Sequence, residues 1–427
     1  MANTRAINRP LNNRQFFVLA LGAAVIVRLL LMPFFAHVDL FSEYRRVFYV
    51  LENDLYFDNA HRSLVFYIEL VFAWLSQLFI PITEGLFDLQ DPTKSVSTLV
   101  DYGFFLNDPN IFRHLFFFKL PYLLFDVATA VLIWKFIDKP EHKKLALLIW
   151  LFNPVTLFAT YIFGRFEVIS LFFLAATALQ LKQDRLFVAT IMFSLSLLCR
   201  EINILFTPFF LLALIDFKDH WFRNAMVVFF SAVLIAIIHS FPAWLMPKLG
   251  GNLNLFIDPN VKHASDAFNK LLSLGYYWFY PIIIGLASLA VYAWEIGKRS
   301  HAERYVVCCA VALFVYFAFN VHSVHYAAWL TIFPILSIQY GKKIVAPFIA
   351  FIGAWVVLWL LKTDNGVFTL FLAAPLSSDF VGMGHFPSFF NKHIASPELS
   401  LHQAIQIMRA LFCVVMGFFA YRVLRKT

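Results

Sequence analysis

Charged side chains are scarce in this sequence: Asp, Glu, Lys and Arg make up 14% of its 427 residues, and 61% are hydrophobic. A soluble globular chain has about 25% charged and about 45–50% apolar residues. The shortage of charge therefore excludes a soluble enzyme, a disordered chain and a nucleic-acid-binding protein. The net charge of +8 is better explained by the orientation of a membrane protein than by a polyanionic partner. The composition predicts an all-α polytopic membrane protein.

Cysteines, glycosylation acceptors and repeats are few or missing. The four cysteines lie in or beside apolar segments, which gives no disulfide framework and no CxxC metal site. No Asn-x-Ser/Thr acceptor occurs, which disfavours a glycosylated eukaryotic surface protein. No internal repeat or separate soluble domain is visible, so residues 1–427 are interpreted as one membrane domain.

Twelve apolar segments have lengths typical of membrane-spanning helices or somewhat below them. They are residues 16–35, 113–137, 145–163, 166–181, 186–199, 202–215, 224–246, 271–296, 305–320, 326–340, 344–361 and 403–421. The first has no small-residue cleavage site after it and is interpreted as a retained span. Segments 186–199 and 202–215 are too short to cross a bilayer straight, so their ends are expected in protein or in a water-filled cavity.

A further apolar run, residues 64–82, decides the topology. If it lies on the membrane, both termini are cytoplasmic and 18 of the 34 basic residues fall in seven short inner segments. If it spans, 15 of those 18 move outside, which the positive-inside rule disfavours. We therefore predict an interfacial helix at 64–82 within a long outer loop, residues 37–112, which is more typical of a functional loop than of a linker. Residues 362–402 form the last outer loop and are a candidate cover for the site.

Acidic, basic and imidazole side chains mark four of the predicted outer links. They are Asp39 and Glu43 after the first span, Arg165 and Glu167 after the third, Arg200 and Glu201 after the fifth, and His322 and His325 after the ninth. Polar groups at membrane depth are costly and usually functional, and a transport pathway tends to spread them through the bundle. Their grouping at one face favours a site at the outer surface.

Each of these residues also has a structural interpretation. Asp39 fits a helix cap, Glu167 a partner for Arg165, Arg200 an arginine that reaches the outer headgroups, and His325 a buried interface histidine. Within the spans, Lys119 and Asp126 are interpreted as a polar contact within one helix or between helices, and Arg28 as serving the same structural purpose.

Four stretches together resemble a known family. They are RLLLMPFFAHVDLFSEYRRVFYVLENDLYF (28–57), FKLPYLLFDVATAVLIWKF (118–136), LFNPVTLFATYIFGRFEVISLFFLA (151–175) and HSVHYAAWLTIFPIL (322–336). Their order and shared membrane side are similar to GT-C type integral-membrane glycosyltransferases that use polyprenyl-phosphate sugars. The resemblance is to bacterial polyprenyl-phosphate-mannose enzymes and to the first mannosyltransferase of GPI-anchor synthesis. The latter has Asp-x-Asp in the first loop where this chain has Asp39-Leu-Phe, so no divalent metal or other cofactor is expected.

The resemblance implies a GT-C fold with about 12 transmembrane helices and an inverting transfer of one sugar, mannose by similarity, at the extracytoplasmic face. The donor would be a polyprenyl-phosphate sugar and the acceptor a lipid-linked molecule or glycan, in contact with membrane lipid. Asp39 would be the general base, because an acceptor hydroxyl needs a positioned carboxylate to take its proton. The donor phosphate would bind Arg200, His325 and Tyr326, with Arg165 behind them, and Glu43, Glu167 and His322 would bind sugar or acceptor. The plasma membrane of a bacterium is favoured over the endoplasmic reticulum.

Two other classes stay open. A transporter or lipid flippase predicts repeats and charges near the midplane of the membrane. A membrane acyltransferase would use His322 or His325 as its base and would leave the position of Asp39 without a role.

Overall fold

The computed structural model describes most of the chain and is almost entirely helical there. The described residues are 12–53, 56–57, 63–80, 106–216, 221–249, 255–256, 299–319, 324–341, 345–362, 370–377, 379–380, 386–396 and 399–424. The helices are α1 (Asn13–Leu31), α2 (Val38–Asn53), α3 (Ser63–Gln77), α5 (Ile111–Phe136), α6 (Pro140–Phe152), α7 (Pro154–Leu157), η4 (Phe158–Ile162), α8 (Glu167–Lys182), α9 (Leu186–Cys199), η5 (Glu201–Phe206), α10 (Thr207–Leu214), α11 (Trp221–Leu249), α14 (His301–Phe319), η6 (Val324–Ala328), α15 (Trp329–Ser337), α16 (Val345–Lys362), η8 (Leu370–Ala373), α17 (Phe386–His393) and α18 (Leu401–Leu424).

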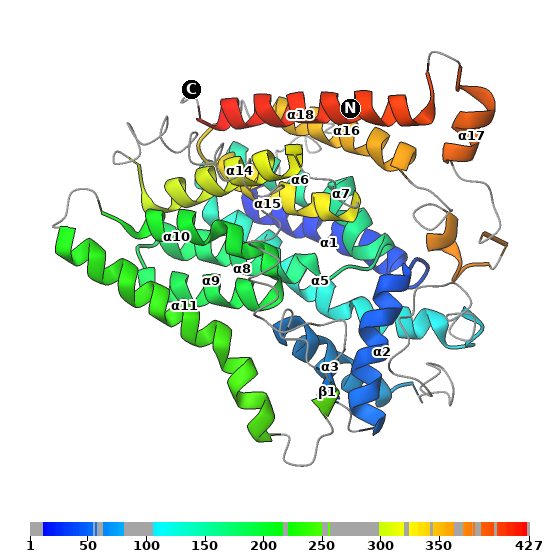
Figure 1. The fold of residues 1–427 in the computed structure, drawn as a ribbon, viewed down its shortest axis with the longest axis horizontal. Coiled ribbons are helices and arrows are strands. Elements are labelled where there is room, and N and C mark those ends of the chain that lie inside the picture. Colours follow the sequence, from blue (N-terminus) through cyan, green and yellow to red (C-terminus); the bar gives the residue numbers. More distant parts are fainter. Residues whose placement is uncertain are drawn as a thin grey trace, which may run out of the picture.

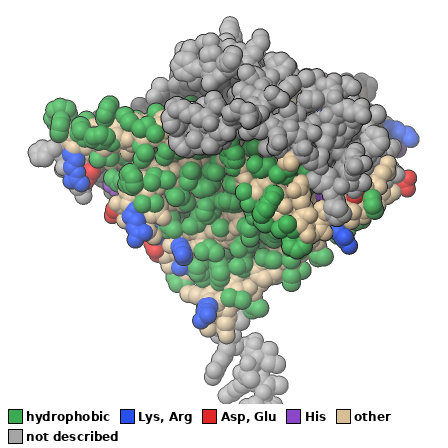
Figure 2. All heavy atoms as spheres, turned by 90° about the horizontal axis from the view of Figure 1, so that it is seen from below, with side chains coloured by type: hydrophobic (Ala, Val, Ile, Leu, Met, Phe, Trp, Pro, Cys, Tyr) green, Lys and Arg blue, Asp and Glu red, His purple; other side chains and the backbone are tan. Residues whose placement is uncertain are grey.

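The helices follow the apolar segments of the sequence. The predicted segment 271–296 lies outside the described residues, and each of the other segments overlaps a helix. Five helices of the described chain are long and apolar enough to cross a membrane: Asn13–Leu31, Ile111–Phe136, Pro140–Ile162, Trp221–Ile238 and Leu401–Phe419. Figure 2 shows a broad apolar area on one face of the molecule, with the few charged side chains mostly near its edges. These features are those of an all-α membrane protein.

Most of these helices lie side by side, and α2 runs across them (Figure 1). The centre of the bundle is α8, which packs against α5, α9 and α14 and is buried along nearly its whole length. Its small side chains, such as Ala175, Ala178 and Thr177, allow neighbouring helices to approach closely, which is the main source of stability between helices in a membrane.

The helix α3 corresponds to the predicted interfacial segment 64–82, and residues 81–82 lie outside the described residues. It packs against α2, α5 and α9. Two strands of two residues each, β1 (Tyr56–Phe57) and β2 (Leu255–Phe256), pair in parallel. This short pairing joins the predicted first outer loop to the segment after α11, two regions that the predicted topology places on the same side.

The links between helices meet in two separate groups. In one group the backbone N–H of Ala36 donates to the carbonyl of Leu372 (3.0 Å), and that of His37 to the carbonyl of Phe163 (3.0 Å). In the other, Asp138 lies 2.7 Å from the ammonium of Lys182 and accepts a hydrogen bond from Gln339 (2.7 Å). Every link in the first group is predicted to be outer and every link in the second is predicted to be inner. The first group therefore also contains η8 (Leu370–Ala373), one of the described parts of the predicted cover.

Candidate functional site

The link that carries Arg165 is shaped by an unusual helix end. The side chain of Asn153 caps α7 by accepting the backbone N–H of Val155 at 3.0 Å. The chain then widens into the π-helix η4, a form that occurs frequently at functional sites. Gly164 follows with a φ of +87°, and a Cβ at this position would lie 2.9 Å from the Cδ2 atom of Leu40. Only glycine therefore fits both this backbone conformation and the close approach of α2.

Asp39 lies in the first turn of α2, directly beside this link. Its backbone N–H lies 3.1 Å from the Nδ1 atom of His37, and a carboxylate oxygen of Asp39 lies 3.4 Å from the same ring nitrogen. The carboxylate of Asp39 accepts a hydrogen bond from the Nη1 atom of Arg165 at 3.0 Å. The helix α2 begins at Val38, and Asp39 and Glu43 share one of its faces, since Nη1 of Arg165 lies 3.0 Å from Asp39 and 4.0 Å from Glu43.

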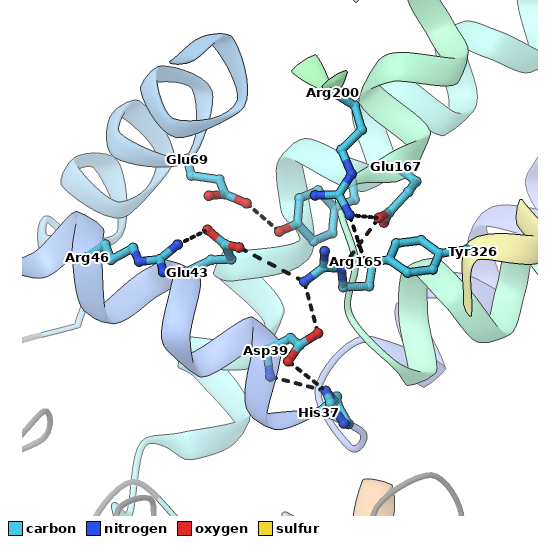
Figure 3. Close-up of polar contacts among 10 residues, drawn as sticks. His37, Asp39, Glu43, Arg46, Glu69, Arg165, Glu167, Arg200 and Tyr326 are labelled. Atoms are coloured by element: carbon cyan, nitrogen blue, oxygen red, sulfur yellow. Dashed lines mark hydrogen bonds and ion pairs between the residues drawn. The ribbon is translucent and has the colours of Figure 1, made fainter. Parts of the chain in front are cut away.

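Arg165 is at the centre of the cluster (Figure 3). Besides Asp39 and Glu43, its Nε atom lies 3.5 Å from a carboxylate oxygen of Glu167. Burial alone would lower the pKa of Arg165, but the neighbouring Glu167, Asp39 and Glu43 outweigh it and raise that pKa above its ordinary value. Arg165 is thus a permanent cation held among three carboxylates.

A second arginine continues the cluster toward η6. The Nη2 atom of Arg200 donates to the hydroxyl of Tyr326 at 3.0 Å and lies 3.7 Å from Glu167. Its guanidinium also lies over the rings of Phe166 and Tyr326, with centroid distances of 5.3 and 5.4 Å. Arg200 is therefore held against the side chains of this cluster, with 12% of its own side chain exposed.

Burial is unequal within the cluster. The Arg165 and Glu167 side chains are 4% and 1% exposed, whereas that of Asp39 is 38% exposed. Burial raises the pKa of Asp39, but the contacts with His37 and Arg165 outweigh it and hold that pKa well below its usual range. Within the described residues neither carboxylate oxygen of Glu167 makes a hydrogen bond. The cluster thus offers one accessible carboxylate and one buried carboxylate that still has room for donors.

His325 lies against the aromatic rings of the same links. Its ring centroid is 4.2 Å from that of Phe163 and 4.2 Å from that of Tyr326. Burial and the nearby Arg165 lower the pKa of His325, so the neutral ring is favoured at neutral pH. The other predicted histidine, His322, lies outside the described residues.

The structure thus brings together Asp39, Glu43, Arg165, Glu167, Arg200, His325 and Tyr326, seven of the eight predicted site residues. Sequence reasoning missed His37, although it stands two residues before Asp39. It also missed Glu69 on α3, which is buried and accepts a hydrogen bond from Tyr122 at 2.6 Å. An acid within a long apolar run, as in the sequence around Glu69, was the available signal.

No group of three or more His, Cys, Asp or Glu side chains in the described part of the chain is arranged to hold a metal ion. The space between Asp39, Glu43 and Glu167 is occupied by the guanidinium of Arg165. The fold and this cluster define an all-α membrane protein with a charged site where its predicted outer links meet. Comparisons with protein-family models, with curated proteins and with solved structures gave no match to this chain.

Proposed function

We propose that the protein is an inverting membrane glycosyltransferase that moves one sugar from a polyprenyl-phosphate donor to an acceptor hydroxyl, with Asp39 as general base. The observation that carries the proposal is the contact of Asp39 with Arg165 in one cluster that also holds Arg200 and Tyr326. This cluster combines an accessible proton acceptor with fixed cations. Those are the two requirements for displacing a phosphate by an alcohol.

The reaction balances with these groups alone. The acceptor oxygen forms a bond to the anomeric carbon while the bond from that carbon to the phosphate oxygen breaks. The acceptor proton passes to the carboxylate of Asp39, and the bonding electrons leave with the polyprenyl phosphate. Arg200 and the hydroxyl of Tyr326 would stabilise the charge that develops there, with Arg165 behind them. Attack opposite the leaving group inverts the anomeric centre.

The remaining side chains fit the recognition of hydroxyl groups. Glu167 has carboxylate oxygens without hydrogen bonds in the described chain, and Glu43 is only 10% exposed. Buried carboxylates of this kind accept hydrogen bonds from sugar hydroxyls. His325, whose neutral ring lies against Tyr326, would be a further donor to phosphate, and His322 is proposed to contact sugar or acceptor. Mannose remains the proposed sugar and a lipid-linked molecule or glycan the proposed acceptor.

The finer fold belongs to the same proposal. A GT-C fold with about 12 spans, cytoplasmic termini and an extracytoplasmic site would place the lipid donor in the plasma membrane of a bacterium. The separation of the helix links into two groups supports this arrangement. A cysteine placed near Asp91 should then react with an impermeant thiol reagent in intact cells, and one near Glu141 should be shielded. The reverse labelling would contradict the proposed topology.

The decisive experiment offers purified protein a panel of polyprenyl-phosphate sugars, with a membrane-lipid extract as the source of acceptor. Free polyprenyl phosphate is measured for the wild type, Asp39→Asn and the control Asp138→Asn. We expect one donor to turn over, and Asp39→Asn to lower the rate about 10³-fold, within the range of general base catalysis. Asp138→Asn, at the opposite group of links, should change the rate less than about threefold.

Three results would contradict the proposal in different ways. Turnover that survives Asp39→Asn would remove the assigned base, and a transferred acyl group would point to a histidine-based acyltransferase. No turnover of any donor, with lipid or solute movement across vesicles instead, would favour the transporter.

A further inference from the structure

Lys119 is a residue of α5 whose side chain is buried within the protein, and it is not part of the cluster around Arg165. Its side chain is 0% exposed, and a buried ammonium is costly unless its donors are matched. Its Nζ atom donates to the carbonyls of Met32 (2.9 Å), Tyr161 (2.8 Å) and Phe35. An ammonium has three donors, so these three carbonyls satisfy the group completely.

The three carbonyls belong to the two segments that carry the reactive pair. Met32 ends α1, and Phe35 stands four residues before Asp39. Tyr161 is part of η4 and stands four residues before Arg165. One ammonium therefore joins the two segments, four residues before Asp39 in one and four residues before Arg165 in the other. The side chains of Asp39 and Arg165 meet at 3.0 Å.

Further contacts continue this junction toward the site. The backbone N–H of His37 donates to the carbonyl of Phe163 at 3.0 Å, and the ring centroids of these two residues lie 3.8 Å apart. Tyr161 is held a second time from α5, since its hydroxyl donates to Asp126 at 2.7 Å. Lys119 thus fixes the backbone of Tyr161 and Asp126 fixes its side chain, which leaves the segment before Arg165 little freedom.

We propose that Lys119 is a positioning residue that sets the separation of Asp39 and Arg165. The expected effect on catalysis rests on the proposed function, because the separation of Asp39 and Arg165 affects the rate of sugar transfer only if Asp39 is the base. An apolar side chain at this position would leave three carbonyls without the donor that the ammonium provides. The three carbonyls lie at the end of α1, in the link that follows it and in η4, and Lys119 supplies donors to both segments at once.

The test replaces Lys119 by methionine, which keeps the length of the side chain and removes its donors. The matched control is Lys182→Met, because Lys182 also donates to a backbone carbonyl, that of Phe136 (2.5 Å), in the other group of links. Two quantities are measured per folded molecule: kcat with KM for the donor, and the pKa of the Asp39 carboxyl by carbon-13 NMR, assigned with Asp39→Asn.

We expect Lys119→Met to lower kcat about 100-fold with KM changed less than about threefold, since a displacement of about 1 Å costs that much. The pKa of Asp39 should rise as Arg165 moves away from it, and Lys182→Met should change neither quantity. Unchanged kcat and pKa in folded Lys119→Met would overturn the inference. If that variant does not accumulate, Lys119→Gln, which keeps two donors, should give a smaller change in the same direction, and no change would again overturn it.

The two proposals fail separately. The NMR titration reports the separation of Asp39 and Arg165 whether or not sugar is transferred. A raised Asp39 pKa in Lys119→Met together with a wild-type protein that transfers no sugar would contradict the proposed function and support the positioning contact. Sugar transfer by the wild type, together with an unchanged Asp39 pKa in Lys119→Met, would support the proposed function and contradict the positioning contact.

Discussion

Two arginine–aspartate pairs in the described part of the chain differ in how fully the acid is hydrogen-bonded. Asp126 accepts the Nε atom of Arg28 at 2.6 Å, the indole N–H of Trp150 at 2.7 Å and the hydroxyl of Tyr161 at 2.7 Å. Arg28 and Asp126 are 1% and 0% exposed. This pair joins α1, α5, α6 and η4 and has the features of a structural contact within a membrane bundle.

The pair formed by Asp39 and Arg165 is more open. Asp39 is 38% exposed, and Arg165 shares its charge with Glu43 and Glu167 at the longer distances of 4.0 and 3.5 Å. A carboxylate that is accessible and ionised is available to a substrate, whereas Asp126 has both oxygens occupied. The difference separates a residue that maintains the fold from one that is suited to chemistry, although both are aspartates paired with arginine.

The largest effect is expected from a substitution that breaks the pair formed by Arg28 and Asp126. Asp126→Asn keeps the size of the side chain but leaves the Arg28 guanidinium buried without its counter-charge. Removing one partner of a buried pair costs about 3–5 kcal/mol, so we expect a large loss in the free energy of unfolding, measured by denaturant titration in detergent micelles. The control Asp138→Asn breaks an ion pair whose acid is 65% exposed and should cost about 0–1 kcal/mol. Equal losses in the two variants would contradict the structural role of Asp126.

Features that depend on the order of residues along the chain can be predicted from the sequence, whereas contacts between distant segments cannot. The helices follow from uninterrupted apolar segments, and α9 has the predicted bounds, Leu186–Cys199. The grouping of Asp39 with Arg165 and Arg200 follows from counting membrane crossings, because alternate links meet at the same end of a bundle. Such reasoning needs only the order of polar and apolar residues along the chain.

The details that give the site its chemistry do not follow from that order. The π-helix at Phe158–Ile162 is followed by Gly164, whose backbone Leu40 approaches closely, and this contact joins residues far apart in the sequence. The partners of Lys119 are backbone carbonyls, which have no sequence signature, so its contact with two other segments was recognised only as a polar contact within one helix or between helices. The exposure of Asp39 depends on how α2 lies across the bundle, and this orientation is a tertiary property.

A smaller effect is expected in the pH dependence of kcat/KM, which reports the ionisation of Asp39 beside Arg165. In the wild type the contacts with His37 and Arg165 favour ionised Asp39, and its pKa lies well below the ordinary value of about 3.9. The proposed base is therefore fully ionised from pH 5 to 8, and no acid limb from Asp39 should appear in kcat/KM over that range. In Arg165→Gln the opposing effect of burial is no longer balanced by the guanidinium, so the acid limb should move to higher pH.

This shift is measured from the pH dependence of kcat/KM in both proteins. Arg113→Gln, which removes an exposed arginine from α5, is the control and should leave the profile unchanged. A limb in Arg165→Gln at the wild-type position would show that Arg165 does not control the ionisation of Asp39.

The smallest expected effect concerns the stability of the open region alone. Burial lowers the pKa of both His37 and His325 in the folded protein, below the value of about 6.5 expected when the chain is unfolded. The groups facing His325 are Asp39, His37, Arg165 and Arg200, and the cations among them disfavour its protonation. Below about pH 6.5 the unfolded chain binds protons that the folded chain does not.

This contribution to stability is therefore complete above about pH 6.5 and is lost as the pH falls from that value through the lower pKa of the folded state. The melting temperature should decrease from pH 7 to pH 5, and His325→Gln should reduce the slope. His393→Gln removes an exposed histidine of α17 and should leave the slope unchanged. The pair Arg28–Asp126 has no histidine among its partners in the described chain. The loss of stability at low pH should therefore arise around Asp39 and Arg165 and not around Arg28 and Asp126. Hydrogen exchange that increases first around α2 and η6, before α5 and α6, would locate it there, and the opposite order would contradict the assignment.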